Sequence, residues 1–531
     1  MNLKLLFTAS ASVLLTGCFD VPPLESTHTR AEQAGLQSYY GQPVNPSSLE
    51  FHQLPQDNQY LSTLKNGLHF DNYNSDVSNY PGPIGRGKLE LTSHKLSDMV
   101  SACPTVMFTA EGDIASVCLY GYREPPYTAT YLHLFDKHTL AIKASLELPR
   151  KQNLGGGDAS GGGYAHMDAQ NRVVTANTDH TIRHIRLEKD PQGLYSWVEE
   201  EVVDLSGIFA VMPDYEPGAS YLNDGVQDYQ GRYWFTLGTG EVGYYDPSTN
   251  RTGYHDFGEQ LQNQTAMDPT GVYVVTGGTA EQPDVGYMNK LVVEQDGTLK
   301  VAWSTPYDNS GKGVLAKTSG TTPTLFGRND NYLTVADNGK DQLHVNIYNR
   351  TTGEEICSVA VFPKGRGGAE DSMIGYQDSV VIANTGNYVK GASPLQTFNG
   401  LAKVTVLTDD MSVPAEQRCV KDWEDTSVKH TAVPVLSTQT GLIYTYPIRE
   451  GNKLEASDQY GTFHYYMAGV DWHSGQVQFQ RYIGSGKQFD DYMQSVTLGE
   501  SGEFIVTTTN GILVAKENLL LDRSEIVHPQ Q

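Results

Sequence analysis

The sequence predicts an all-β fold, an eight-bladed β-propeller with four antiparallel strands in each blade. The first observation is a series of short runs rich in β-branched and aromatic residues, such as "RYWFTLG", "VYVVTGG", "DSVVIAN" and "EFIVTTT". Runs of this kind, bounded by turn residues, are typical of strands. The second observation is a pair of turn motifs that recurs along the chain, and the third is a spare strand ahead of the first repeat.

Two kinds of hairpin turn alternate along the chain. The first places an acidic or amide residue before a small-residue turn and recurs with spacings of 54, 56, 50, 53, 60 and 62 residues, at Asp136, Asp190, Asp246, Asp296, Asn349, Asp409 and Asp471. The second kind lies between these turns, at Asp168, Asp228, Asp268, Asn329, Gln377, Gln439 and Glu500. Two hairpins in a period of about 55 residues correspond to four strands, which is the content of one propeller blade.

A free strand completes the predicted ring. Seven sets of four strands fill residues 100–482, and the tail supplies three more strands, so the last blade lacks one. The segment "KLELTSHKL", from Lys88 to Leu96, precedes the first blade. Because an unpaired strand edge invites intermolecular pairing, we expect this N-terminal strand to close the last blade. A seven-bladed ring, with one repeat misread, is the alternative.

The chain is therefore expected to have four parts. Residues 1–17 form a signal peptide, and residues 18–85 form a tether that leads into an extended segment over the propeller surface. Residues 86–520 form the propeller, and residues 521–531 form a C-terminal tail.

The N-terminal sequence is typical of an exported protein. One cation, Lys4, precedes an apolar run from Leu5 to Leu15 that is too short to span a bilayer as a helix. The run ends in "LTGC", which resembles the lipobox of bacterial lipoproteins and implies an acylated Cys18 that anchors the protein in a membrane. Phe19, rather than Asp, follows the cysteine and implies export to the outer membrane, with the propeller facing either the periplasm or the surface. The alternative is an ordinary signal followed by an unpaired or buried cysteine.

Charge and cysteine content fit an exported protein. The formal net charge of −25 argues against nucleic-acid binding and favours cationic partners. Four cysteines besides Cys18 form an even set for an oxidising compartment. Cys103 and Cys118 flank the turn-like "TAEGD" and could face each other across a hairpin, which leaves Cys357 to pair with Cys419. Four buried thiols are the alternative.

Two repeats, "YNRTTGEEICSVAVF" and "VDWHSGQVQFQRY", resemble those of quinoprotein-like (PQQ-type) eight-bladed propellers. The resemblance covers most of residues 100–517, but only Trp303 stands where that family has a docking tryptophan. The redox quinoproteins also have a vicinal disulfide and a tryptophan platform, whereas this chain has no Cys-Cys pair and five Trp in all. The resemblance therefore implies a propeller that binds no PQQ.

The loops that enter the first strand of each blade are expected to meet at one mouth of the central channel. They supply an acidic ring with two histidines and two tyrosines, made of Tyr164, His166, Asn223, Asp224, Gln264, Thr265, Thr321, Thr322, Glu370, Asp371, His430, Asp490, Asp491 and Tyr492. Close carboxylates repel one another, and Ca²⁺ held by Asp371 and Asp491 would relieve that repulsion.

Two classes of function fit this sequence. The first is a membrane-anchored scaffold that binds a protein or a glycan at the propeller face without chemistry. The second is a polysaccharide lyase or hydrolase that uses His166, Tyr164, His430 and Tyr492 at the mouth as acid and base. No G-x-S-x-G or HExxH motif is present, which favours the scaffold, but whether the protein is an enzyme stays open.

Overall fold

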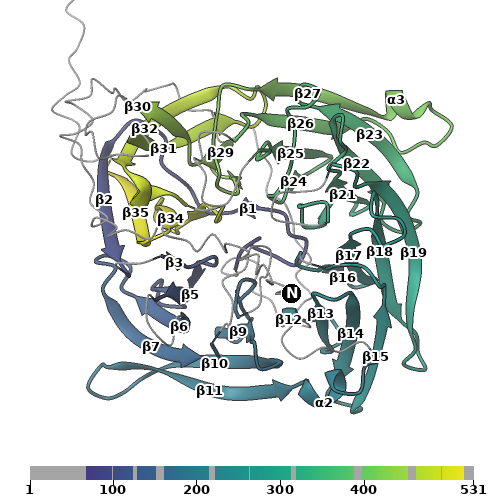
Figure 1. Cartoon of the computed structure of the whole chain (residues 1–531). Helices are drawn as coiled ribbons and strands as arrows, with labels where there is room; N and C mark the ends of the chain where they lie inside the picture. Colours follow the sequence, from purple (N-terminus) through teal and green to yellow (C-terminus); the bar gives the residue numbers. More distant parts are fainter. Residues whose placement is uncertain are drawn as a thin grey trace, which may run out of the picture.

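The structure, a computed structural model, describes residues 67–97, 100–122, 128–150, 161–213, 222–261, 263–311, 318–387, 397–451, 462–491 and 493–518. These residues form a ring of eight blades around a central channel (Figure 1). Helix in the described chain is confined to α2 (Ser206–Phe209), α3 (Ala415–Arg418) and one short 3₁₀ turn, so no described helix is long enough to cross a membrane. The predicted all-β, eight-bladed propeller is confirmed, and the seven-bladed alternative is wrong.

The strands of each blade follow one another outward from the channel in chain order. Blade 1 contains β3 (Ser101–Ala102), β4 (Met107–Phe108), β5 (Ile114–Gly121), β6 (Thr128–Phe135) and β7 (Ile142–Leu148). Blade 2 contains β8 (His166–Met167), β9 (Arg172–Ala176), β10 (Thr181–Lys189) and β11 (Tyr195–Asp204). Blade 3 contains β12 (Leu222–Gln227), β13 (Tyr233–Leu237), β14 (Glu241–Asp246) and β15 (Arg251–Asp256). Blade 4 contains β16 (Ala266–Asp268), β17 (Gly271–Thr276), β18 (Val285–Val293) and β19 (Leu299–Asp308).

The second half of the ring repeats this order. Blade 5 contains β20 (Thr324–Phe326), β21 (Tyr332–Ala336), β22 (Leu343–Asn349) and β23 (Glu355–Val361). Blade 6 contains β24 (Ile374–Tyr376), β25 (Ser379–Ala383), β26 (Leu401–Val406) and β27 (Cys419–Asp425). Blade 7 contains β28 (Val435–Ser437), β29 (Leu442–Thr445), β31 (Thr462–Asp471) and β32 (Val477–Ser485), and β30 (Ile448–Gly451) pairs with β31. Blade 8 contains β33 (Thr497–Leu498), β34 (Phe504–Thr508) and β35 (Gly511–Asn518).

The ring is closed by β2 (Lys88–Lys95), as predicted. This strand pairs antiparallel with β35 along its whole length, from Lys88 opposite Asn518 to Lys95 opposite Gly511. Strand β2, from the N-terminal part of the described chain, and the C-terminal strand β35 therefore lie side by side in one sheet (Figure 1). Closure gives blade 8 the four strands that most other blades have.

Burial follows the position of each strand in its blade. Inner strands lie between neighbouring blades and are mostly apolar, and every residue of β21 and β25 is buried. Outer strands face solvent on one side, and β19 alternates between half-buried and exposed residues along most of its length. Burial on both faces explains why the sequences of the inner strands are nearly continuous apolar segments.

The recurring acidic turns act as side-chain caps. Asp136 accepts hydrogen bonds from the backbone amides of His138 and Thr139, at 3.1 and 2.9 Å, in the turn between β6 and β7. Asp228 caps the turn between β12 and β13 in the same way. In blade 6 the capping residue is Asp410 rather than the predicted Asp409, and it accepts from the amide of Ser412 at 2.9 Å.

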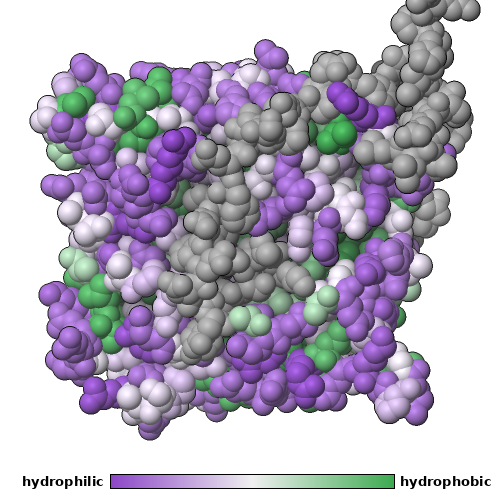
Figure 2. Space-filling model, turned by 180° about the vertical axis from the view of Figure 1, so that it is seen from behind, coloured by the Kyte–Doolittle hydropathy of each residue, from purple (hydrophilic) through white to green (hydrophobic). Residues whose placement is uncertain are grey.

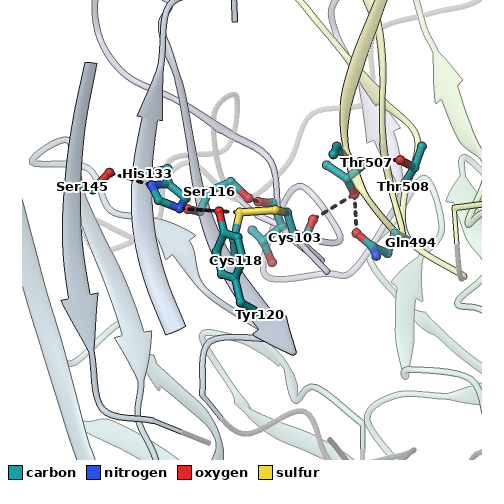
Figure 3. The surroundings of a disulfide bond; sticks show 11 residues. Cys103, Ser116, Cys118, Tyr120, His133, Ser145, Gln494, Thr507 and Thr508 are labelled. Carbon is teal, nitrogen blue, oxygen red and sulfur yellow. Dashed lines mark hydrogen bonds between the residues drawn. A yellow bond between two sulfur atoms is a disulfide. The ribbon is translucent and has the colours of Figure 1, made fainter. Parts of the chain in front are cut away.

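Both predicted disulfides are present. Cys103–Cys118 joins the residue that follows β3 to β5 in blade 1 (Figure 3). Thr507 of blade 8 donates to the backbone carbonyl of Cys103 at 2.9 Å, so this disulfide lies at the closure of the ring. Cys357–Cys419 joins the outer strands β23 and β27 and therefore fastens blade 5 to blade 6.

Residues 67–78, which we call the channel segment, pass through the middle of the ring. The carbonyls of Asn72, Tyr73, Ser75 and Asp76 accept backbone hydrogen bonds at 2.9 to 3.0 Å from the inner strands of blades 4, 5, 6 and 7 in turn. The segment ends in β1 (Val77–Ser78), which pairs parallel with β28 and lies near the centre of Figure 1.

The position of the channel segment corrects one expectation. The stretch before residue 86 was expected to run over the propeller surface, but residues 67–78 lie inside the ring, because their carbonyls satisfy amides of four blades. The predicted signal peptide, most of the tether and the C-terminal tail lie outside the described residues.

Candidate functional site

The predicted mouth residues lie at or just before the inner strands, around the channel segment. Tyr164, Gln264 and Glu370 are half-buried, and Tyr492 lies outside the described residues. The others are buried, namely His166, Asn223, Asp224, Thr265, Thr321, Thr322, Asp371, His430, Asp490 and Asp491. The chain's own channel segment, rather than solvent, is in contact with several of them.

Asp224 lies on the blade 3 side of the channel. Its carboxylate accepts hydrogen bonds from the amide and the hydroxyl of Thr265, at 2.9 and 2.8 Å. Asn74 of the channel segment donates to the carbonyls of Thr265 and Pro323, both at 3.1 Å. Burial raises the pKa of Asp224 to about 6. Asp224 therefore fixes Thr265, and the carbonyl of Thr265 binds Asn74 of the channel segment.

The channel segment is also fixed by a Ser, His and Asp group. His69 Nδ1 lies 2.9 Å from Ser372 Oγ and 3.1 Å from Asp76 Oδ1, and Ser372 also donates to Asp76. Thr322 Oγ1 lies 3.3 Å from the other ring nitrogen, Nε2. A catalytic triad needs serine and aspartate on different nitrogens of the imidazole, whereas here both use Nδ1. The group therefore fastens the channel segment to blades 5 and 6 and is not arranged for nucleophilic attack.

Asp71 shapes the channel segment from within. It accepts hydrogen bonds from the amides of Tyr73 and Ser75, at 2.8 and 3.2 Å, and from the Ser75 hydroxyl. Burial raises its pKa to about 7. The Tyr73 ring that follows is buried, and the Arg350 guanidinium lies 5.1 Å from its centre.

Asp371 and Asp491 are two buried carboxyls of the site. Burial raises the pKa of both carboxyls well above the usual range, and each is also affected by a neighbouring carboxylate. Asp491 accepts a 2.6 Å hydrogen bond from Thr431, whereas both oxygens of Asp371 lack a partner. Among the described residues, no group of three or more His, Cys, Asp or Glu side chains is arranged to hold a metal ion, so the calcium site stays a prediction.

The two candidate histidines are buried and uncharged at neutral pH. Burial lowers the pKa of His166 to about 4, and it lowers that of His430 too. His430 Nδ1 lies 3.1 Å from the carbonyl of Ala432. Side chains this deeply buried do not present an acid and a base to a polymeric substrate.

Sequence reasoning missed the polar residues that fill the channel, above all His69, Asp71, Asn74 and Asp76. The signal was present in "GLHFDNYNSD", where side chains able to cap backbone amides are unusually dense. A segment with so many polar residues is expected to be a surface loop, because nothing in the local sequence indicates that its hydrogen-bond partners lie on four separate blades.

The similarity of this chain to known proteins is remote. No family model matches it. An uncharacterized protein of Archaeoglobus fulgidus is 22% identical over 337 residues, and the match covers 56% of this chain and 61% of that relative's length. The solved Dos1 propeller is 10% identical with a TM-score of 0.42, covering 80% of this chain and 94% of its own. The dihydro-heme d1 dehydrogenase NirN, in complex with DHE, is 8% identical with a TM-score of 0.38, covering 88% of this chain and 81% of its own. These values carry no information on activity.

Proposed function

We propose that this protein is an outer-membrane lipoprotein, anchored through Cys18, whose propeller binds a protein or a glycan as a scaffold. One observation carries the proposal. The channel segment occupies the centre of the ring, where the inner-strand loops of a propeller enzyme would bind its substrate. A channel filled by its own chain leaves the outer surfaces of the propeller for partners.

The charge of these surfaces favours a cationic partner. The formal net charge is −25, and the face shown in Figure 2 is mostly hydrophilic with small, separate hydrophobic patches. Hydrogen bonds in their turns lower the pKa of the exposed Asp296 and Asp410, so these carboxylates stay ionised. Fixed charges of one sign steer an oppositely charged partner and select its orientation.

The alternative, a polysaccharide lyase or hydrolase, has less support. It relies on Tyr164, His166, His430 and Tyr492, and the burial of both histidines does not favour acid-base chemistry on a polymer. We also propose, from the sequence alone, that the protein binds no PQQ.

The Cys18→Ala variant tests the anchored scaffold. Because the thiol is the proposed acylation site, the variant should incorporate no radioactive palmitate and should leave the outer-membrane fraction while keeping its fold. A photo-crosslinking amino acid at Thr249, in an exposed turn of blade 3, should give discrete adducts in cells carrying the Cys18 chain. Those adducts should weaken in the alanine variant.

Two results would count against the proposal. Palmitate that persists in the alanine variant would exclude Cys18 as the anchor. Release of unsaturated or newly reducing sugars from polysaccharides by the purified chain, abolished by His166→Ala, would replace the scaffold with the enzyme.

A further inference from the structure

Unsatisfied acceptor oxygens gather at the end of the channel that blades 6 and 8 border. Both carboxylate oxygens of Asp371 and one oxygen of Asp491 lack a hydrogen-bond partner. The two side chains are only 2% and 0% exposed, respectively. A buried acceptor without a partner costs free energy comparable to a lost hydrogen bond or more, so native proteins satisfy such atoms with a ligand, an ion or a water molecule.

The local charge at this point is negative. Asp371 lies within electrostatic range of Asp491, Glu370 and Asp76, and Asp491 lies beside Asp490. None of the ion pairs in the described chain includes Asp371 or Asp491. His69, the nearest potential cation on the channel segment, is already paired with Asp76 at 3.1 Å.

A third element directs another unsatisfied oxygen toward the same place. The hydroxyl of Tyr446, from blade 7, is fully buried, has no hydrogen-bond partner and interacts electrostatically with Asp491 and Asp490. Its ring is held by stacking on Tyr465, with centroids 5.4 Å apart, and by contact with Phe504. A buried hydroxyl without a partner, within electrostatic range of carboxylates, is a further oxygen that a bound group could satisfy.

We propose that Asp371 and Asp491 bind a hard cation of the Ca²⁺ class at this point, with Tyr446 beside it. Ca²⁺ takes about six to eight oxygen ligands, and carbonyls and water molecules can supply those that two carboxylates do not. Such a site needs no third His, Cys, Asp or Glu, so it is compatible with the absence of any group of three such side chains arranged for a metal among the described residues. The ion would connect the loops that enter blades 6 and 8, and it does not depend on the scaffold role.

Thermal unfolding of the full-length chain in detergent tests this site. At pH 8, which favours ionisation of the two carboxyls despite their raised pKa, Ca²⁺ added after EDTA treatment should raise the Tm by about 2 °C or more, because the ion binds only the folded chain. Tb³⁺ should bind in its place and give luminescence sensitised by the neighbouring Tyr446. In an Asp371→Asn, Asp491→Asn variant both responses should vanish, and the Tm in EDTA should exceed that of the wild type because the repulsion is gone.

The control is an Asp246→Asn, Asp410→Asn variant, which changes the charge equally in turns far along the chain from this site. It should keep the full Ca²⁺ response. A wild-type Tm that is indifferent to Ca²⁺ but rises when the pH falls from 8 to 5 would overturn the proposal, since protons would then neutralise the carboxyls. An equal Ca²⁺ shift in both double variants would also overturn it, because the ion would then bind elsewhere.

Discussion

Deleting β2, residues 88–95, should cause the propeller to aggregate. This strand pairs with all eight residues of β35, so its loss exposes a full strand edge at the last blade. Unpaired amides and carbonyls along such an edge are a template for pairing with other chains. Size-exclusion chromatography should therefore show the deletion variant in the void volume or in the insoluble fraction.

The matched control is a deletion of residues 22–60, which leaves β2 and the channel segment in the chain. It should yield soluble, monodisperse protein once the membrane anchor is solubilised. Equal losses of soluble protein from the two deletions would show that β2 does not close the ring.

Tyr73→Ala should destabilise the propeller by about 3–5 kcal/mol, the usual cost of truncating a large buried aromatic side chain. Tyr73 is 1% exposed and packs in one hydrophobic cluster with Tyr273 and Leu325 of the two neighbouring blades. Its removal also deprives Arg350 of the ring above which its guanidinium lies. Denaturant unfolding followed by tyrosine and tryptophan fluorescence measures the change.

Tyr254→Ala is the control, because this tyrosine lies on the outer strand β15 and is 40% exposed. Its truncation should cost no more than about 0.5 kcal/mol, as is usual for surface substitutions. If Tyr73→Ala were as mild as Tyr254→Ala, residues 67–78 would not be part of the core.

The features that sequence reasoning predicted well are local or repetitive. Strands such as β21 and β25 are mostly apolar and buried throughout, and the capping residues Asp136 and Asp228 precede turns whose amides they satisfy. Closure of the ring could be predicted by counting strands. The last blade lacked one strand, and the segment before the first blade supplied a spare strand that pairs with β35.

The filled channel could not be predicted in the same way. Its stability depends on contacts across very long sequence separations, such as His69 with Ser372 and Asn74 with Pro323. Of the predicted carboxylates, Asp371 and Asp491 lie within electrostatic range of each other. Their burial depends on what occupies the channel, and the occupant is a polar segment with no apolar periodicity.

The central claim, that residues 67–78 fill the channel, is tested most directly by an engineered disulfide between Ser78→Cys and Ser437→Cys. These residues are partners in the parallel pair β1–β28, where Cα atoms lie about 5 Å apart, within the range that a disulfide spans. Non-reducing digestion and mass spectrometry should find the two peptides joined, and no such product should form when Ser78→Cys is combined with Ser358→Cys on the outer strand β23. Two freely alkylated thiols at positions 78 and 437 would contradict the claim and reopen the channel as a site for substrate.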